Sequence, residues 1–227
     1  MEDGKSMNKL NILYEDNHII VVEKRPNILS QSDITKDIDL LTMVKSYIKE
    51  KYNKPGNVYL GLVHRLDRPV GGLMVFAKTS KAAKRLSEQI KNKEFSKYYL
   101  AIIDNNIKED SGVFKDKLKK LDNGNTIVSD DGKESILEYN VLDRKDNKTL
   151  VKINLLTGRH HQIRVQFSSR GYPLVGDQRY NKQDKKQICL YAYKICFNHP
   201  TTKERLEFSK LPDKKDSWTL FTMSKNV

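Results

Sequence analysis

Residues 64–78 carry the sequence HRLDRPVGGLMVFAK, the most informative stretch of this chain. It sets Arg65 and Asp67 two residues apart in a segment that turns at Pro69 and at two glycines, and the apolar run LMVFA follows directly. An apolar run that starts at such a turn predicts a buried strand. A carboxylate just before a buried strand is costly to bury unless it forms an ion pair or takes part in catalysis. Asp67 is therefore either a salt-bridged loop residue or a functional carboxylate.

The regions on either side of this stretch carry strand and helix patterns. A helix is expected over 38–52, with Asp37 or Asp39 as its N-cap, and another over 81–92, capped by Thr79 or Ser80. Runs rich in strand-forming residues predict a set of strands. These lie within 12–26, 73–77, 95–103, 136–142, 149–156, 161–167, 188–197, 205–210 and 218–223.

Strands outnumber helices, and many neighbours in sequence are expected to pair antiparallel. This predicts an α+β fold with a mixed, mainly antiparallel sheet and flanking helices. The polar segment 104–135 is the expected excursion from the core, and His199–Pro200 is an expected turn. No repeat or interdomain linker is evident, so we expect a loose leader over 1–8 and a single domain over 9–227.

The chain is strongly basic. It has 227 residues with 42 Lys and Arg against 29 Asp and Glu, a formal net charge of +13. A domain this basic is expected to bind a polyanion, most often nucleic acid. Many of the lysines lie in runs of mixed sign, which equally fit solvated loops. Charge alone therefore leaves RNA binding open.

Cysteine and histidine usage argues against a metal site. Cys189 and Cys196 do not form a CxxC pattern. His160 and His161 are adjacent, so on a strand they would point to opposite faces. We expect no metal, reduced thiols and a cytoplasmic protein. The N-terminus lacks the apolar core of a signal peptide, and no run approaches the roughly 18 apolar residues of a membrane span.

A second basic, polar loop lies at LLTGRHHQIR, residues 155–164. Arg159 has the planar donor pattern that matches a phosphate. If 161–167 is a half-buried strand, Arg164 points away from the apolar face of Ile163 and into a cleft over the sheet. A carboxylate and an arginine from distant loops would then meet in this cleft. The alternative is an exposed strand arginine.

Two adjacent tyrosines follow a similar logic. Tyr98 and Tyr99 lie on a predicted strand, so one faces the core and the other faces the cleft. An aromatic ring in a nucleic-acid site stacks on a base. Both residues also fit as ordinary strand tyrosines.

Taken together, these motifs form a known pattern. They are ILYEDNHIIVVEKRPNIL at 12–29, HRLD at 64–67 with Gly72 and AK at 77–78, Lys97-x-Tyr99-x-Ala101, TGRHHQIRVQF at 157–167 with GDQRY at 176–180, and NHP at 198–200. In this order the chain resembles the RluA class of RNA pseudouridine synthases over nearly its whole length. The resemblance implies an isomerase that acts on RNA and needs no cofactor or metal.

The resemblance also assigns roles to individual residues. Asp67 matches the essential catalytic aspartate, Tyr99 the tyrosine that stacks on the target uracil, and Arg164 the arginine that pairs with the aspartate. Arg65 matches an arginine that contacts RNA and fills the space left by the target base. The further RNA-binding residues expected on these loops are His64, Arg159, His161 and Gln162.

The chain departs from the family pattern at a few positions. Val70 and Gly71 stand where the family usually has Thr and Ser, and His160 stands where Thr or Ser is usual. Gln166 and Tyr191 each replace a frequent His. None of these changes removes a proposed catalytic group. An S4-type RNA-binding domain is not expected, since about eleven residues precede the first motif.

The expected substrate is structured RNA, either rRNA or tRNA, with the target base flipped into the site. We expect a monomer with no obligatory protein partner and no membrane association. One alternative is a non-catalytic RNA-binding or RNA-chaperone protein on the same fold. Another is a glycosidase-type hydrolase that uses Glu134 and Glu138 as its two carboxylates.

Overall fold

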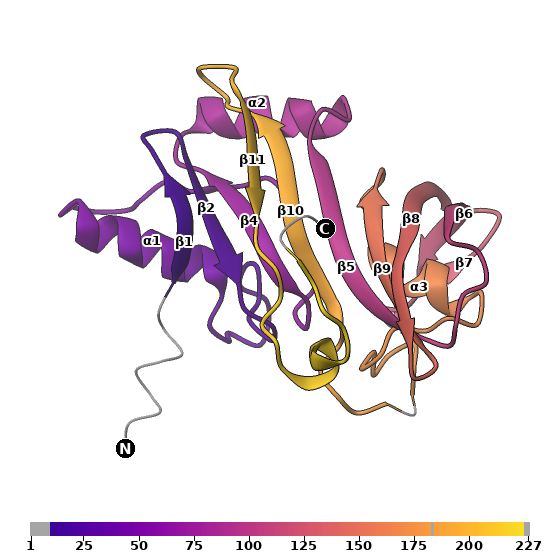
Figure 1. Cartoon of the computed structure of the whole chain (residues 1–227). Helices are drawn as coiled ribbons and strands as arrows, with labels where there is room; N and C mark the ends of the chain where they lie inside the picture. Colours follow the sequence, from indigo (N-terminus) through magenta and orange to yellow (C-terminus); the bar gives the residue numbers. More distant parts are fainter. Residues whose placement is uncertain (1–9, 183, 225–227) are drawn as a thin grey trace. The chain divides into compact units, whose positions relative to one another are not determined.

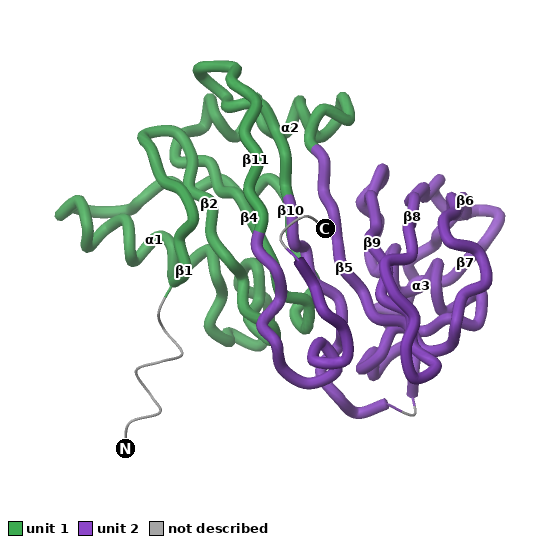
Figure 2. Tube along the Cα trace, viewed as in Figure 1, with its two compact units in different colours: residues 1–95, 195–209 green, residues 96–194, 210–227 purple. Residues whose placement is uncertain are grey.

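The computed structural model of this chain describes residues 10–182 and 184–224, so the predicted leader at 1–8 lies outside the described residues. The chain forms two compact units (Figure 2). Unit 1 comprises residues 1–95 and 195–209, and unit 2 comprises residues 96–194 and 210–227. No separate linker joins them, because one boundary falls where a strand begins at Ser96 and another falls inside a strand, after Lys194.

Unit 1 contains two helices and a mainly antiparallel set of strands (Figure 1). Strand β4 pairs with the whole of β2 and with the short β3, both antiparallel. The elements are β1 (Asn11–Glu15), β2 (Ile19–Lys24), α1 (Leu40–Lys51), β3 (Gly61–Leu62), β4 (Gly71–Ala77), α2 (Ser80–Lys91), the second half of β10 (Leu190–Asn198) and β11 (Arg205–Ser209).

The predicted buried strand is confirmed as β4. All seven of its residues are buried, and its Leu73, Val75 and Ala77 pack in one core cluster. Ala82 and Leu86 of α2 join that cluster. The strand is apolar throughout because it has neighbours in the sheet and a helix against one face.

The two predicted helices are also confirmed. Asp39 caps α1 by accepting a hydrogen bond from the backbone N–H of Thr42. Thr79 caps α2 by accepting from the N–H of Ala82. Each cap satisfies a backbone donor that the first helical turn leaves unpaired.

The NHP turn has a clear structural reason. His199 Nδ1 accepts hydrogen bonds from the backbone N–H groups of Thr201 and Thr202, so the proton sits on Nε2, which lies 2.7 Å from an Asp16 carboxylate oxygen. His199 therefore closes the turn between β10 and β11 and ties it to the turn between β1 and β2.

Unit 2 contains an antiparallel sheet in the order β5-β9-β8-β6-β7 (Figure 1). The predicted hairpin between residues 136 and 156 is confirmed, and it turns at Asp146 and Asn147, both with positive φ. The elements are the first half of β10, β5 (Ser96–Asp104), β6 (Ser111–Lys120), β7 (Thr126–Val128), β8 (Lys133–Lys145), β9 (Lys148–Leu155), α3 (Gln162–Ser168) and a 3-10 helix (Asp216–Leu220).

The two faces of this sheet are covered by different segments. On one face Leu100 and Ile102 pack in a cluster with Trp218 and Phe221 near the C-terminus. On the other face Tyr139 of β8 contacts Phe167 of α3. The helix α3 therefore lies over the face that carries the odd-numbered residues of β5, as the register below shows.

Three predictions were wrong in detail. The supposed excursion at 104–135 contains β6 and β7, because Phe114 and Leu118 alternate with solvent-facing lysines and are buried. Residues 161–167 form helix α3 rather than a strand, since the polar side chains between the apolar ones are buried too. Residues 218–223 contribute to a 3-10 helix and an extended end, which buries Trp218.

The fold class is thus α+β with a mostly antiparallel sheet, as predicted. None of the helices in the described ranges is long and apolar enough to cross a membrane.

Candidate active site

The loop 63–70 of unit 1 presents Asp67 between β3 and β4. Ser30 fixes the backbone of this loop, because its Oγ donates to the Leu66 carbonyl at 2.8 Å and accepts from the Leu66 N–H at 3.1 Å. The Asp67 carbonyl accepts a hydrogen bond from the Val70 N–H at 3.0 Å, which closes a tight turn. The backbone around Asp67 is therefore held on both sides.

A fully buried lysine binds the backbone of this loop. Lys24 has no exposed surface, and its ammonium donates to the carbonyls of Arg25, Ile28 and Arg68 at 3.2, 2.6 and 3.0 Å. Burial lowers the pKa of Lys24 to about 7, and the negative charge of Asp67 opposes that fall. Lys24 thus fastens the end of β2 to the Asp67 loop. Sequence reasoning missed this role, although the cation directly follows the apolar run IIVVE.

The other predicted residues on this loop differ in exposure. Arg65 is exposed to solvent. His64 is half-buried, and its Nε2 accepts a hydrogen bond from the Val75 N–H while the ring lies against Phe95. His64 therefore has a structural part in joining the loop to β4, whatever RNA contact it makes.

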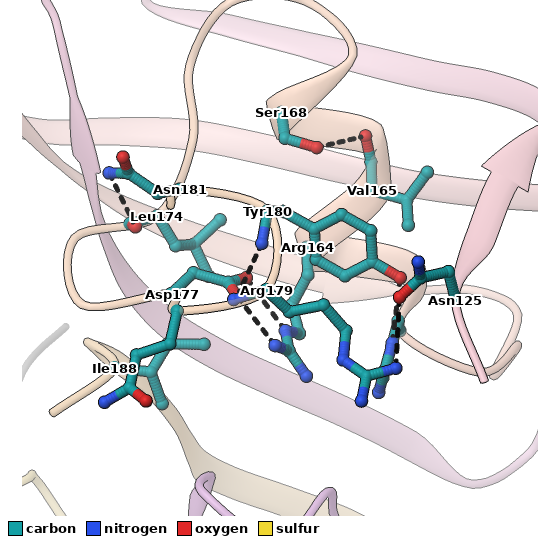
Figure 3. A network of polar contacts seen from close by, with 12 residues as sticks. Asn125, Arg164, Val165, Ser168, Leu174, Asp177, Arg179, Tyr180, Asn181 and Ile188 are labelled. Carbon is teal, nitrogen blue, oxygen red and sulfur yellow. Dashed lines mark hydrogen bonds and ion pairs between the residues drawn. The ribbon is translucent and has the colours of Figure 1, made fainter. Parts of the chain in front are cut away.

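In unit 2, Arg164 forms a buried ion pair with Asp177 (Figure 3). Its Nε lies 2.8 Å from one carboxylate oxygen and its Nη2 lies 2.6 Å from the other. One Asp177 oxygen also accepts from the backbone N–H groups of Arg179 and Tyr180. Charge-assisted bidentate pairs of this kind hold a guanidinium in one orientation. Since removing one partner leaves a buried charge, such a pair is sensitive to mutation.

Tyr180 completes the surroundings of Arg164. Its ring lies under the guanidinium, with 5.2 Å from the Arg164 Cζ to the ring centroid. Its hydroxyl accepts from the Thr126 N–H at 2.9 Å and hydrogen-bonds His161 Nδ1 at 2.9 Å. Tyr180 therefore connects Arg164 to β7 and to the start of α3. The GDQRY motif contained Asp177 and Tyr180, but sequence reasoning gave them no role.

The histidine pair is arranged differently from the prediction. His161 is the residue before α3 and has a positive φ of 52°, so the chain turns sharply there. This turn places the two imidazole rings in a stack, with centroids 3.7 Å apart, rather than on opposite faces. His160 Nδ1 also hydrogen-bonds Thr126 Oγ1 at 2.8 Å. The unusual His160 is thus part of the packing of this loop against β7.

Gln162, predicted as an RNA contact, is buried. Its side-chain oxygen accepts from Thr157 Oγ1 and from the Arg159 N–H, and its nitrogen donates to Gln166. These bonds shape the loop, so we assign Gln162 to positioning. Arg159 itself is exposed, and its Nε donates to the Glu134 carbonyl at 3.1 Å.

Tyr99 lies on the same face of unit 2 as α3. It is directly opposite Ile153 of β9, which is directly opposite Tyr139 of β8, and opposed residues of an antiparallel sheet share a face. Because Tyr139 contacts Phe167 of α3, Tyr99 and the helix that carries Arg164 lie on the same face of the unit 2 sheet. Tyr98 lies on the other face and packs against the cluster around Leu100.

Comparison with known proteins agrees with this arrangement. A model of the family described as RNA pseudouridylate synthase matches residues 18–169. The chain belongs to this family. It is therefore placed among isomerases that act on RNA, and the matched span includes Asp67, Tyr99 and Arg164.

Individual relatives place the chain in the RluA class. It is 34% identical to an uncharacterized RNA pseudouridine synthase of Aquifex aeolicus, over 88% of this chain and 68% of that protein. It is 32% identical to the dual-specificity RNA pseudouridine synthase RluA of Pasteurella multocida, over 89% and 93%. The solved structure of human RNA Pseudouridylate Synthase Domain Containing 1 matches with a TM-score of 0.74 and 25% identity, over 94% and 87%.

Asp67 belongs to unit 1, and Tyr99 and Arg164 belong to unit 2. Among the described residues, no group of three or more His, Cys, Asp or Glu side chains is arranged to hold a metal ion.

Proposed function

We propose that this chain converts specific uridines of structured RNA to pseudouridine, with Asp67 as the catalytic carboxylate. The observation that carries the proposal is the construction of the Asp67 loop, whose backbone is fixed by hydrogen bonds from Ser30 and Lys24. A loop fixed in this way holds the reacting carboxylate in one position.

The reaction breaks the bond between uracil N1 and ribose C1′, turns the base and joins C1′ to C5. The carboxylate of Asp67 either attacks C1′ or removes a proton from C2′ to give a glycal. In both routes the electron pair of the broken N1–C1′ bond leaves with the uracil. C5 then bonds to C1′, either displacing the Asp67 carboxylate or adding to the glycal as C2′ regains its proton. C5 finally loses its proton, and N1 gains one. No atom is gained or lost overall, so the protein has to hold the detached base rather than supply a reagent.

Tyr99 and Arg164 are proposed to share that task. Stacking of the uracil on the Tyr99 ring contributes about 1–3 kcal/mol. A guanidinium has five N–H donors, and two of those of Arg164 bind Asp177. The family resemblance gives Arg164 the role of orienting the catalytic carboxylate, and we propose that role here. Asp177 and Tyr180 act through Arg164 as positioning residues.

The substrate is proposed to be rRNA or tRNA. The relatives include a ribosomal large subunit pseudouridine synthase C of Buchnera aphidicola and the dual-specificity enzyme of Pasteurella multocida. The exposed Arg65 and Arg159, with His64 and His161 beside them, are proposed to contact the RNA backbone and fill the space of the flipped base. We further propose that both units act as one catalytic domain, as a monomer in the cytoplasm.

The test is release of tritium from unmodified rRNA and tRNA transcripts labelled at uridine C5. The wild-type protein is expected to release tritium, and Asp67→Asn is expected to release none while its RNA Kd changes less than about threefold, since a neutral isostere keeps the surface. Asp130→Asn, an exposed carboxylate with the same charge change, serves as the control. Wild-type RNA binding without tritium release would instead support a non-catalytic RNA-binding protein.

A further inference from the structure

Lys97 lies on the face of the unit 2 sheet that carries Tyr99 and α3. It is the second residue of β5 and precedes Tyr99 by two positions. Because side chains alternate along a strand, Lys97 and Tyr99 project from the same face. This is the face that α3 covers, as the register through Ile153 and Tyr139 shows.

The ammonium of Lys97 lies against the backbone of Gly158 in the arginine loop. A Cβ placed on Gly158 would be 3.1 Å from Lys97 Nζ, so the loop passes directly over the amine. A side chain at this position would crowd the amine, which would have to shift by a few tenths of an ångström. Gly158 is itself exposed, and the next residue, Arg159, carries an exposed guanidinium.

Lys97 is half-buried, and in the described parts of the chain its amine is solvated by water rather than by a protein acceptor. Within residues 10–182 and 184–224, no group accepts a hydrogen bond from Lys97 or forms an ion pair with it. Burial alone lowers its pKa. Lys24, which is fully buried, differs because it has three carbonyl acceptors. An ammonium that is partly shielded from water and has no protein acceptor can gain a charge-assisted hydrogen bond from a bound anion.

We propose that Lys97 and Arg159 bind one RNA phosphate across Gly158, beside the nucleotide that stacks on Tyr99. This inference rests on the proposed function, because it takes RNA as the ligand. The phosphate supplies the acceptor that Lys97 lacks, and the absence of a side chain at Gly158 lets the phosphate approach the amine. Arg159 is exposed and is anchored through Nε to the Glu134 carbonyl, and we assign its terminal nitrogens to the same phosphate.

The experiment compares Lys97→Met with wild type for binding to a twelve-nucleotide oligouridylate at several salt concentrations. Loss of one charge-assisted contact is expected to raise Kd about tenfold. Loss of one phosphate contact on a single strand is expected to reduce the slope of log K against log salt by about 0.7. Lys97→Arg is expected to keep the slope. Lys145→Met, which removes an exposed lysine of the same unit, is the matched control and should change neither quantity.

The thermal midpoint of the free protein separates a binding role from a structural one. Because Lys97 has no acceptor, Lys97→Met is expected to keep or raise the midpoint. A lower midpoint with unchanged RNA binding would make Lys97 a structural residue and overturn the inference. A higher Kd with an unchanged salt slope would indicate contact with the uncharged base and would also overturn it, as would failure of the wild type to bind the oligouridylate at low salt.

This test is independent of the isomerase assay. If the wild type released no tritium from any transcript but Lys97→Met still lowered the salt slope, the proposed function would fail and the phosphate site would stand. If tritium release were normal and the slope unchanged, the phosphate site alone would fail.

Discussion

Replacing the buried lysine beneath the Asp67 loop is expected to change how stability depends on pH. Lys24 is fully buried and its pKa is lowered from 10.5 to about 7, chiefly by burial. Between these two values the unfolded chain holds a proton on this amine that the folded chain has largely lost. The free energy of unfolding therefore rises with pH in this window through Lys24, since the unfolded state binds more protons.

The size of the effect follows from the two pKa values. One proton contributes up to 1.36 kcal/mol per pH unit, so Lys24 should add about 2 kcal/mol to the free energy of unfolding between pH 7 and pH 9. Above pH 9 a second group opposes this trend, because burial raises the pKa of Cys189 to about 12. The comparison is therefore confined to pH 7–9, where Lys24 dominates the difference between the variants.

The assay is urea unfolding of wild type, Lys24→Met and Lys49→Met at pH 7, 8 and 9. Lys49 is an exposed lysine of α1, so its replacement should leave the pH dependence as in wild type. Lys24→Met should lose about 2 kcal/mol of the rise seen in wild type. Parallel curves for wild type and Lys24→Met would refute the assignment of a depressed pKa to this amine.

Three further changes probe the rest of the chain. Arg164→Met should lower tritium release at least a hundredfold and raise the RNA Kd less than tenfold, since it removes a group that acts on the reacting carboxylate; equal losses would make Arg164 a phosphate contact. Tyr180→Phe removes the acceptor of the Thr126 N–H, so the free energy of unfolding in urea should fall by about 1–3 kcal/mol. An unchanged unfolding midpoint would show that the hydroxyl does not stabilise the fold. The pKa of Glu15 is lowered to about 2 despite the opposing effect of burial, because lysine and tyrosine side chains hydrogen-bond its carboxylate. The contribution of Glu15 to the free energy of unfolding is therefore complete above its unfolded pKa near 4.5 and is lost as the pH falls towards 2. In Glu15→Gln, the free energy of unfolding should therefore fall by about 2 kcal/mol less than in wild type as the pH drops from 4.5 to 2, measured by circular dichroism. Identical acid-unfolding curves for the two proteins would contradict this.

Local sequence signals were enough for much of the fold. The apolar run at 73–77 and the capping residues Asp39 and Thr79 predicted β4, α1 and α2, because those elements depend on patterns within a dozen residues. The order of motifs was enough for the family, which the matched span 18–169 confirms. The roles of Asp67 and Tyr99 remain predictions of that resemblance.

The helix α3 shows where local signals failed. The alternation of Ile163, Val165 and Phe167 with polar residues predicted a strand. The polar side chains are instead buried, because Gln166 hydrogen-bonds Asp116, fifty residues earlier, and Arg164 pairs with Asp177. A pattern cannot reveal that a polar residue is buried when its partner comes from a distant segment.

The amino-acid sequence alone established the class of fold, the family and the basic charge, since those follow from residue type, motif order and short-range spacing. Only the tertiary structure distinguished the buried Lys24 from the half-buried Lys97, because burial of an ammonium and the number of its acceptors depend on which backbone passes over it. Lys24 meets three carbonyls and strengthens the Asp67 loop, whereas Lys97 meets a bare glycine. That difference in solvation energy separates a cation that supports the fold from one that is available to a ligand.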